Sequence, residues 1–456
     1  MKKMAMGGKL GMMMSATMLL GVLAGCGGGG NANNQAGGSA TPSQSPSATA
    51  SESASPEASG SGSGTGSKTT VQFWHSLSGK NGEYMDQLIK RFNDSHPNVE
   101  VVGTFQGGYD ETVTKLQQGL ASNTAPDMSM LERAYVQMFA DSDVLEDLTP
   151  YLASSGLSAD DFTAGLMGHS IFDDKLVALP LNRSTPILHI NKTLLDEKGL
   201  SVPTTWEELK KTANALVVKE NGQVSRYGLT MPYDTWYPLA MITQAGGKFF
   251  NDEGTSVGYG DEGVKTFQYL KDLQNAGALY YPPAKDSGNI VNNMFIDGKV
   301  AMMFQSTGSI GGLAGSVTFD YATAFLPKDV RNATPTGGGN VVMLSTSKNK
   351  DAAWEFLNWL ETDPQGAQAF IVQSGYLPFT KAMTESKEIQ DLWAKEPNRK
   401  VAYDQLQYAV DTNKSVHWPE VMKEFFSAIE AIMYDNKDIP STLDGFKKSA
   451  EQILAQ

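Results

Sequence analysis

Two sequence periodicities alternate through residues 68–456, and this alternation is the strongest constraint on the fold. A strand pattern at Thr70–Trp74 precedes apolar residues at helical spacing in Tyr84–Asn93 and a second strand pattern at Val99–Val102. Further helical stretches and short apolar runs follow: Asp110–Ser122, Leu188–Ile190, Trp206–Lys219, Asp261–Asn275, Val300–Phe304, Val341–Leu344, Lys350–Thr362 and Glu420–Tyr434. Helices alternating with short strands predict an α/β architecture.

Residues 68–456 are also too many for one hydrophobic core, so we expect two lobes. Pro/Gly-rich linkers do not divide this stretch, but Leu179–Pro186, Lys299–Gln305 and Gly337–Ser345 have the character of extended crossings. Repeated crossings form a hinge beside a cleft, where ligands commonly bind. We predict that residues 68–184 plus 305–340 form lobe 1 and that residues 185–304 plus 341–456 form lobe 2.

The N-terminus has the pattern of a secretory signal. Lys2, Lys3 and Lys9 precede the apolar stretch Leu10–Val22, which is too short to span a bilayer stably. The next residues, Leu23-Ala24-Gly25-Cys26, resemble the lipobox of bacterial lipoproteins, in which the cysteine carries a diacylglycerol. We therefore expect a signal peptide over residues 1–25 and a lipid anchor on Cys26, the single cysteine; the alternative is an unpaired thiol.

A tether is predicted for residues 26–67, which follow the signal peptide. Gly27–Ser67 contains Gly, Ser, Ala, Thr, Asn, Gln, Pro and two Glu, with no aromatic or large aliphatic side chain to build a core. A flexible chain of this length has an end-to-end distance on the order of 35 Å. The expected location is the extracellular face of the cytoplasmic membrane.

Charge and residue spacing exclude several other functions. The net charge of −14 argues against nucleic acid as a partner. The five histidines show no metal-ligand spacing, so neither a metal nor a cofactor is expected. Asp160-Asp161 and Asp173-Asp174 could be the paired carboxylates of a glycosidase, but adjacent acids in turns are more typical of caps and solvated loops.

Several segments carry a family resemblance: Phe73-Trp74-His75-Ser76, Gly107-Gly108-Tyr109, Ala125-Pro126-Asp127, Pro180–Leu188, Thr205-Trp206, Ser306–Ser309, Gly337-Gly338-Gly339 and Gly375–Pro378. In this order they resemble the extracellular solute-binding proteins of ABC importers, specifically the sn-glycerol-3-phosphate-binding branch. The resemblance implies a two-lobe periplasmic-binding-protein-like fold of type II with a three-segment hinge, and a permease as partner. It covers nearly all of residues 68–456.

Carried over position by position, the resemblance also implies a binding site. Tyr109, Glu132, Ser184, Ser306, Gly338 and Tyr376 would line the cleft, and Tyr233 and Trp236 would be the aromatic stacking residues. Hydroxyl groups both donate and accept, and a carboxylate accepts, so the set suits the hydroxyls of a polyol.

Trp236 lies between Pro232 and Pro238, where we expect no regular helix, and its ring could cover the apolar face of a carbon skeleton. The alternative role for Trp236 is packing within the lobe core.

One position departs from the pattern of the glycerol-3-phosphate binders. They use an arginine three residues after a proline, whereas Pro419 is followed at that distance by Met422. A phosphate loses its best partner without a guanidinium, although Lys414, Lys423 or Arg183 could substitute. The ligand could therefore be a neutral sugar or oligosaccharide, with Trp418 as another stacking surface.

The resulting prediction is a monomeric, membrane-anchored binding lipoprotein of an ABC importer. It would capture a carbohydrate or glycerol-phosphate-type solute by hinge closure and would perform no chemistry. Two alternatives remain: a sensory receptor of the same fold, and a secreted carbohydrate-active enzyme.

Overall fold

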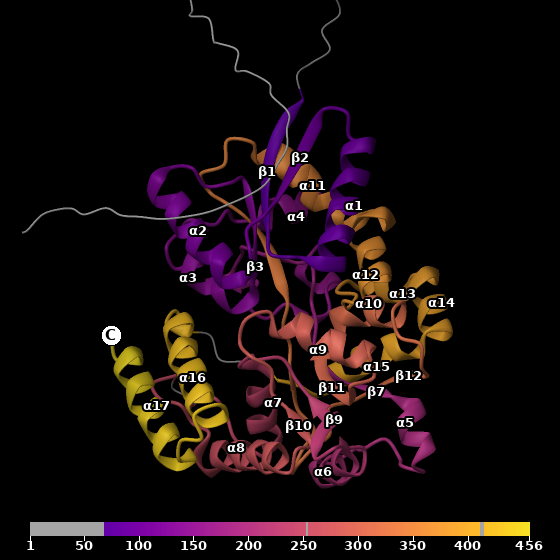
Figure 1. The fold of residues 1–456 in the computed structure, drawn as a ribbon. Helices are drawn as coiled ribbons and strands as arrows, with labels where there is room; N and C mark the ends of the chain where they lie inside the picture. The colour runs from indigo at the N-terminus through magenta and orange to yellow at the C-terminus, as the bar shows by residue number, and fades with distance from the viewer. Residues whose placement is uncertain (1–67, 252–253, 411–414) are drawn as a thin grey trace, which may run out of the picture. The chain divides into compact units, whose positions relative to one another are not determined.

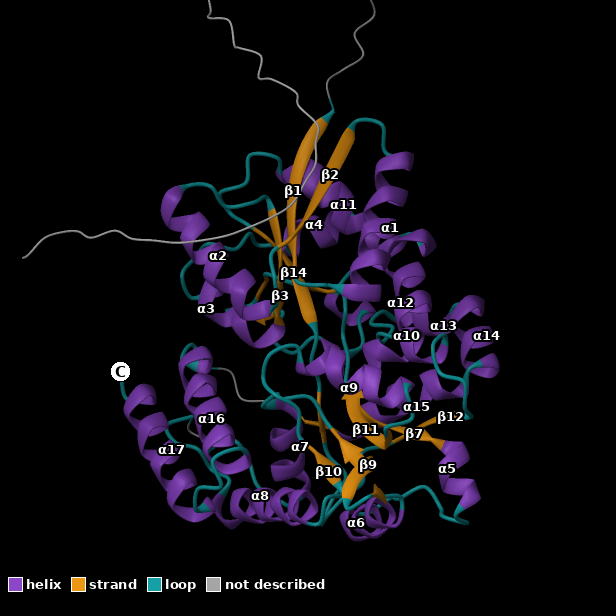
Figure 2. Ribbon diagram, in the orientation of Figure 1, coloured by secondary structure: helices purple, strands orange, loops and turns teal. Residues whose placement is uncertain are grey.

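The computed structural model describes residues 68–251, 254–410 and 415–456. Within this part of the chain, Figures 1 and 2 show two lobes, each built on a β-sheet with helices packed against it. The predicted signal peptide, Cys26 and tether lie outside the described residues.

The first lobe contains a mixed sheet in the order β2-β1-β3-β14-β6. Its strands are β1 (Thr69–His75), β2 (Val99–Phe105), β3 (Met128–Glu132), β6 (Leu179–Pro180) and β14 (Gly339–Met343). β1 runs parallel to β2 and β3, whereas β14 is antiparallel to β3 and β6. Every residue of the inner strand β14 is buried, whereas the edge strand β2 alternates between buried and exposed positions at its start. Burial on both faces explains the continuous apolar run Val341–Leu344.

Helices on the first lobe follow the predicted periodicities. In α1 the residues Met85, Leu88, Ile89 and Phe92 are buried along one stripe. The helices of this lobe are α1 (Gly79–Ser95), α2 (Tyr109–Ser122), α3 (Val136–Ala140), α4 (Thr149–Ser154), α11 (Lys350–Thr362), α12 (Ala369–Ser374), α13 (Lys381–Glu385) and α14 (Lys387–Lys395). The next helix, α15 (Pro397–Gln405), contacts both α14 and β12 (Tyr321–Ala324) of the second sheet. A short hairpin of β4 (Ile171–Phe172) and β5 (Lys175–Leu176) completes the first lobe.

The second lobe contains a sheet in the order β10-β9-β11-β7-β12, with β8 paired to β9. Its strands are β7 (Pro186–Asn191), β8 (Val218–Glu220), β9 (Gln223–Thr230), β10 (Leu279–Tyr280), β11 (Val300–Ser306) and β12 (Tyr321–Ala324). Its helices are α5 (Lys192–Glu197), α6 (Trp206–Ala215), α7 (Trp236–Gln244), α8 (Gly260–Asn275), α9 (Ser287–Ile296), α16 (Trp418–Met433) and α17 (Ile439–Leu454). The helix predicted over Trp206–Lys219 ends at Ala215, because Val218–Glu220 pairs with β9 as a strand.

The chain passes between the two sheets at several points. Leu181–Thr185 joins β6 to β7, and Thr336–Gly338 joins β13 (Thr334–Pro335) to β14. The two passages lie side by side, because the amides of Ser184 and Gly337 donate to each other's carbonyls at 3.1 and 2.8 Å. A third passage follows β11, where α10 (Ile310–Ala314) places Ile310 in the first-lobe core.

Two of the expected crossings are shorter than predicted. Most of Lys299–Gln305 belongs to β11 within the second sheet, and most of Gly337–Ser345 belongs to β14 within the first. The crossings themselves occupy only the residues at the ends of these strands.

The expected lobe boundaries also differ from the observed cores. Residues 341–405 were assigned to lobe 2, but β14 pairs with β3, and Phe356, Phe370 and Trp393 pack in the core that contains Phe73. Residues 305–340 were assigned to lobe 1, but β12 pairs with β7 of the second sheet. The reason is that a strand belongs to the lobe whose sheet it pairs with, and these pairings join strands that are far apart in the sequence.

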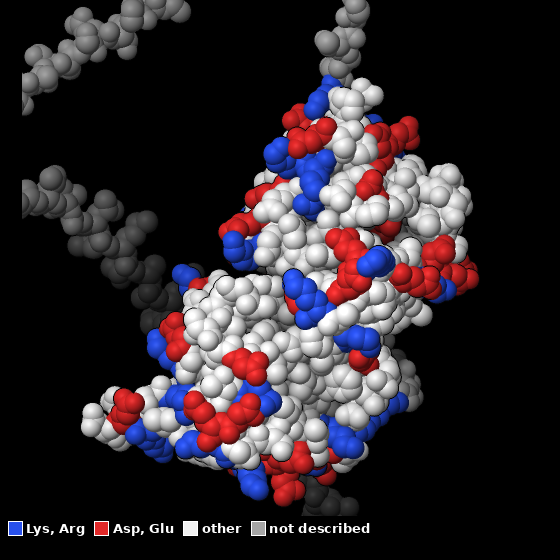
Figure 3. Space-filling view, turned by 90° about the vertical axis from the view of Figure 1, so that its right-hand side faces the viewer, with Lys and Arg blue, Asp and Glu red and all other residues white. Residues whose placement is uncertain are grey.

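Surface charge, helix length and the grouping of metal-ligating side chains were each compared with what a charged partner, a membrane or a metal ion would require. On the face shown in Figure 3, acidic and basic side chains are interspersed over both lobes. No helix in the described ranges combines the length and apolar character needed to cross a membrane. The same residues contain no group of three or more His, Cys, Asp or Glu arranged to hold a metal ion.

Candidate ligand-binding site

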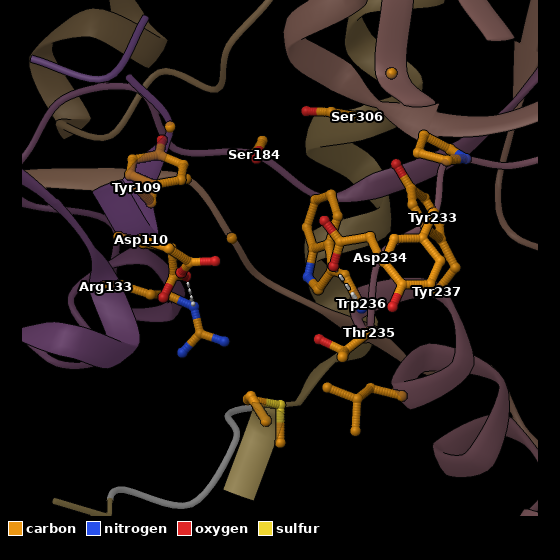
Figure 4. Close-up of a pocket in the computed structure, with 18 of the residues that line it drawn as sticks. Tyr109, Asp110, Arg133, Ser184, Tyr233, Asp234, Thr235, Trp236, Tyr237 and Ser306 are labelled. Carbon is orange, nitrogen blue, oxygen red and sulfur yellow. Dashed lines mark hydrogen bonds and ion pairs between the residues drawn. The ribbon is translucent and has the colours of Figure 1, made fainter. Parts of the chain in front are cut away.

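A cavity of about 640 Å³ lies between the two lobes, and both contribute to its walls. The first-lobe wall includes the start of α2 and the end of β3, and the second-lobe wall includes the start of α7 and one face of α16. Figure 4 shows Tyr109, Asp110 and Arg133 facing Asp234 and Trp236 across the open space.

Tyr109 and Glu132 are held on the first-lobe wall by short-range contacts. The Nδ2 of Asn182 donates to the Tyr109 hydroxyl at 2.7 Å, and its Oδ1 accepts from the Gly339 amide at 2.9 Å. Burial raises the pKa of Tyr109, so this hydroxyl stays protonated. The Glu132 carboxylate accepts from the Ala134 amide at 2.7 Å, and burial raises its pKa although Arg133 acts in the opposite direction.

Arg133 also lines the first-lobe wall, but its side chain, including the guanidinium, is almost completely buried. It is 2% exposed, and its Nε donates to the Thr336 carbonyl at 2.7 Å. Its Nη1 lies 3.0 Å from His169 Nδ1, and Nε lies 3.8 Å from a Glu132 oxygen. Arg133 therefore links β3 to the crossing at Thr336 and partly balances Glu132.

Asp234 and Trp236 form the opposing wall. An Asp234 oxygen accepts from the Trp236 amide at 2.8 Å, directly before α7. Trp236 is the first residue of α7, so the expectation that this segment is not helical is wrong. Pro238 fits because the first turn of a helix does not need its amide hydrogens.

Burial also raises the pKa of Asp234 to about 6, and the carboxylates of Asp110 and Glu132 add to the shift. Asp234 is thus influenced by acids from the other lobe.

The Trp236 ring packs closely on a crossing segment. A Cβ added to Gly337 would lie 2.6 Å from the Trp236 ring, so only glycine permits this approach. The indole Nε1 is buried and has no hydrogen-bond partner within the described part of the chain. Trp236 is half-buried and contacts the second-lobe core, so it both packs and lines the cavity.

The crossings supply three more lining residues, Ser184, Ser306 and Gly338. Gly338 has a φ of +83°, and a Cβ there would lie 1.9 Å from the Asn182 carbonyl oxygen. Ser306 ends β11 and accepts from the Gly308 amide at 3.2 Å. A ligand in this cavity would therefore lie directly against the connections between the lobes.

Tyr376 and Tyr233 complete the predicted set. The Asn81 Nδ2 donates to the Tyr376 hydroxyl at 3.3 Å, and the Tyr233 hydroxyl donates to Glu430 at 3.0 Å. The Tyr233 ring packs on Phe426 with 5.1 Å between centroids.

The structure places all eight predicted residues around this one cavity: Tyr109, Glu132, Ser184, Tyr233, Trp236, Ser306, Gly338 and Tyr376. Sequence reasoning missed Asp110, Arg133, Asn182 and Asp234, which also line it. Asp110 follows Tyr109 and Asp234 follows Tyr233 in the sequence. Their position next to predicted site residues is the sequence feature that could have identified them as lining residues.

Met422 lines the cavity and is 4% exposed, so no cation occupies this position of α16. Of the suggested substitutes, Lys423 lines a neighbouring cavity of about 420 Å³ with Met138 and Pro419, and not the main one. Arg183 is fully buried and donates to Asn340 at 3.2 Å. Lys414 lies outside the described residues.

Trp418, the suggested stacking residue, does line the main cavity.

A cavity between two α/β lobes joined by several crossings is the architecture of a solute-binding protein. The family model described as bacterial extracellular solute-binding protein matches residues 87–397. The chain belongs to this family, whose members bind solutes and are not enzymes.

Individual relatives agree with this assignment. The chain is 26% identical over 361 residues to the sn-glycerol-3-phosphate-binding periplasmic protein UgpB of Escherichia coli K12, covering 74% of this chain and 80% of that protein. UgpB from Mycobacterium tuberculosis, solved with glycerophosphocholine, is 24% identical with a TM-score of 0.76, covering 86% of this chain and 99% of that one.

The ABC substrate-binding protein Lmo0181 from Listeria monocytogenes, solved with cycloalternan, is 20% identical with the same TM-score of 0.76, covering 85% and 99%. These structures establish the shared two-lobe fold.

Proposed function

We propose that this protein is the membrane-anchored receptor of an ABC importer and that it captures a carbohydrate or glycerol-phosphate-type solute. The solute would bind in the cavity between the lobes and be delivered to a permease. The solutes of the named relatives, sn-glycerol 3-phosphate, glycerophosphocholine and cycloalternan, support this range of ligands.

The observation that carries the proposal is the composition of the cavity walls. Hydroxyls of Tyr109, Ser184, Ser306 and Tyr376 and the carboxylate of Glu132 line one space with the ring of Trp236. Alternating polar groups and flat apolar surfaces match a polyhydroxylated carbon skeleton, which has hydroxyl edges and apolar faces.

Closure would follow from the position of these groups on both lobes. A solute that contacts Glu132 and Trp236 together binds the closed form more tightly than the open one, and this difference in affinity shifts the population toward closure. The crossing segments at Ser184 and Gly337 would absorb the rotation.

Attachment to the membrane would depend on Cys26. A diacylglycerol on this residue, followed by the tether through residue 67, would hold the binding lobes near a permease without restricting their orientation. The predicted location is the extracellular face of the cytoplasmic membrane.

Calorimetric titration tests the proposal, with glycerol 3-phosphate, glycerophosphocholine and a series of linear and cyclic oligosaccharides. We expect at least one compound to bind with micromolar or tighter affinity and to reduce the radius of gyration measured by X-ray scattering. A protein that binds none of these compounds, or that binds without becoming more compact, would contradict the assignment. The Trp354→Ala variant is a suitable control, because Trp354 packs on Tyr151 and does not line the cavity.

A further inference from the structure

The walls of the main cavity carry an excess of acidic groups. Asp110, Glu111, Glu132 and Asp234 line it, whereas Arg133 is its one lining residue with a basic side chain among those the structure describes. Glu111 is engaged locally, since its Oε2 accepts from the Gly108 amide at 2.8 Å. The remaining acids set the charge that a solute would meet.

Arg133 offsets this charge only on the first-lobe side. Its guanidinium is engaged by the Thr336 carbonyl, His169 and Glu132. Because the side chain is 2% exposed, it presents little surface to a solute.

Asp234 has no basic partner on its own wall. Its carboxylate accepts from the Trp236 amide, and no ion pair to it occurs within the described residues. Asp110 faces it across the cavity and accepts a hydrogen bond from the Tyr135 hydroxyl. Figure 4 shows the Asp234 carboxylate directed into the space between them.

The charge balance changes when the lobes close around a solute. Closure removes water from Asp234 and brings the acids of the opposite wall nearer, which is unfavourable unless a positive charge enters with the solute. A phosphate monoester would add two more negative charges to the same space. A neutral sugar would leave the repulsion unchanged.

The Trp236 indole gives a second, independent indication. Its Nε1 is buried and has no acceptor among the described residues, so closure of the lobes would have to bring a solute oxygen within its reach. The rings of Trp236, Tyr135 and Tyr233 also line the cavity, and aromatic faces attract cations. The walls therefore fit a molecule with both oxygen acceptors and a positive charge.

We propose that the solute carries a positively charged nitrogen on a polyhydroxylated skeleton, and that this nitrogen binds against Asp234 with Asp110 on the opposite wall. The proposal rests on the function proposed above and specifies the class of solute. Amine-bearing sugars and choline or ethanolamine esters of glycerol phosphate share this chemistry.

Two pairs of probes test the positive charge: the sugar pair is matched in shape, whereas the phosphate pair also differs in size and in the charge of the phosphate. Fully deacetylated chitobiose is compared with cellobiose, and glycerophosphocholine is compared with glycerol 3-phosphate, by calorimetry at pH 7.0. We expect the cationic member of at least one pair to bind ten-fold or more tightly than its partner. The pair that shows the difference identifies the source of the nitrogen as a sugar or as a glycerol phosphodiester.

Variants then test the assigned residue. Asp234→Asn keeps an oxygen that can accept from the Trp236 amide, and it should weaken binding of the cationic probe by about 10- to 100-fold. Asp110→Asn should weaken it by about 3-fold, because Asp110 is exposed and its charge is screened. The exposed Asp160→Asn variant should bind like the wild type.

Three results would overturn the inference. They are equal or tighter binding of the non-cationic member in both pairs, failure of every cationic probe to bind, and an unchanged cationic preference in a folded Asp234→Asn variant. If cellobiose or another neutral sugar binds and compacts the protein while the cationic probes show no advantage, the receptor function stands and the charge assignment fails. If no compound of any class compacts the protein, the receptor function itself fails.

Discussion

A methyl group added at Gly337 should reduce solute affinity while leaving the fold intact. The added Cβ would lie 2.6 Å from the Trp236 ring, whereas ordinary contacts are 3.4–4 Å, so the two groups must separate by about 1 Å. The Gly337 backbone is fixed by its paired hydrogen bonds to Ser184. The ring must therefore move, and the space open to it is the cavity.

The expected size of the effect follows from the cost of overpacking. Displacing a well-packed side chain costs typically about 1–3 kcal/mol. We expect this cost in the bound state, where the displaced ring occupies volume that the solute needs, so the dissociation constant should rise by about 10- to 100-fold. The free protein should lose no more than about 1 kcal/mol of unfolding free energy, because its half-buried ring can relax into the open cavity.

Calorimetry with the tightest-binding solute of the wild type, together with urea unfolding, measures both quantities. Gly445→Ala is the matched control, because outside its chain neighbours and its own helix backbone no atom of the described residues lies within 4 Å of a Cβ added there. Wild-type affinity in Gly337→Ala would refute the assignment of Trp236 to the solute site. An equal loss of stability and affinity would show that Trp236 acts mainly through packing.

Four further outcomes are expected. Trp236→Ala should weaken binding by about 10-fold or more through loss of buried apolar area, and Trp354→Ala should not, as calorimetry would show. Asp234→Asn should stabilise the ligand-free protein at pH 7.5, since the folded state raises the pKa of Asp234 to about 6 and so disfavours its charged form. The increase in unfolding free energy, measured with urea, should become smaller as the pH falls through 6 and be smallest below pH 4. An increase that does not change with pH would contradict the raised pKa. Met422→Arg should increase affinity for glycerol 3-phosphate by about 10-fold by placing a guanidinium on the cavity wall, and unchanged titrations would show that position 422 does not reach the phosphate. Cys26→Ser should release the protein from the membrane fraction, and retention there would disprove the lipid anchor.

Local periodicity was sufficient to predict many secondary-structure elements. The predicted helix Asp110–Ser122 matches α2, Lys350–Thr362 matches α11, and the apolar run Val300–Phe304 lies within β11. In each case the buried residues recur at a regular spacing within one short segment, so the element can be predicted without knowing which distant residues it contacts.

Lobe membership could not be predicted in this way. β14 pairs with β3, and no property of Val341–Leu344 distinguishes one buried sheet from the other. The acid at Asp234 was missed for a related reason, because its significance depends on Asp110 and Glu132 on the opposite lobe. The neighbouring Trp236 could be proposed because a resemblance, and not periodicity, pointed to it.

The placement of β14 has a consequence for how the protein folds. β3 lies between β1 and β14, so the first sheet remains incomplete until residues 339–343 have been synthesised. At about 5–20 residues per second, β1 would wait roughly 15–50 s for this strand to appear. The second core also needs α16 and α17 from the end of the chain. Neither lobe can fold fully as an N-terminal fragment, so the nascent chain should stay unfolded until it is nearly complete, and pairings between residues so far apart should make folding slow.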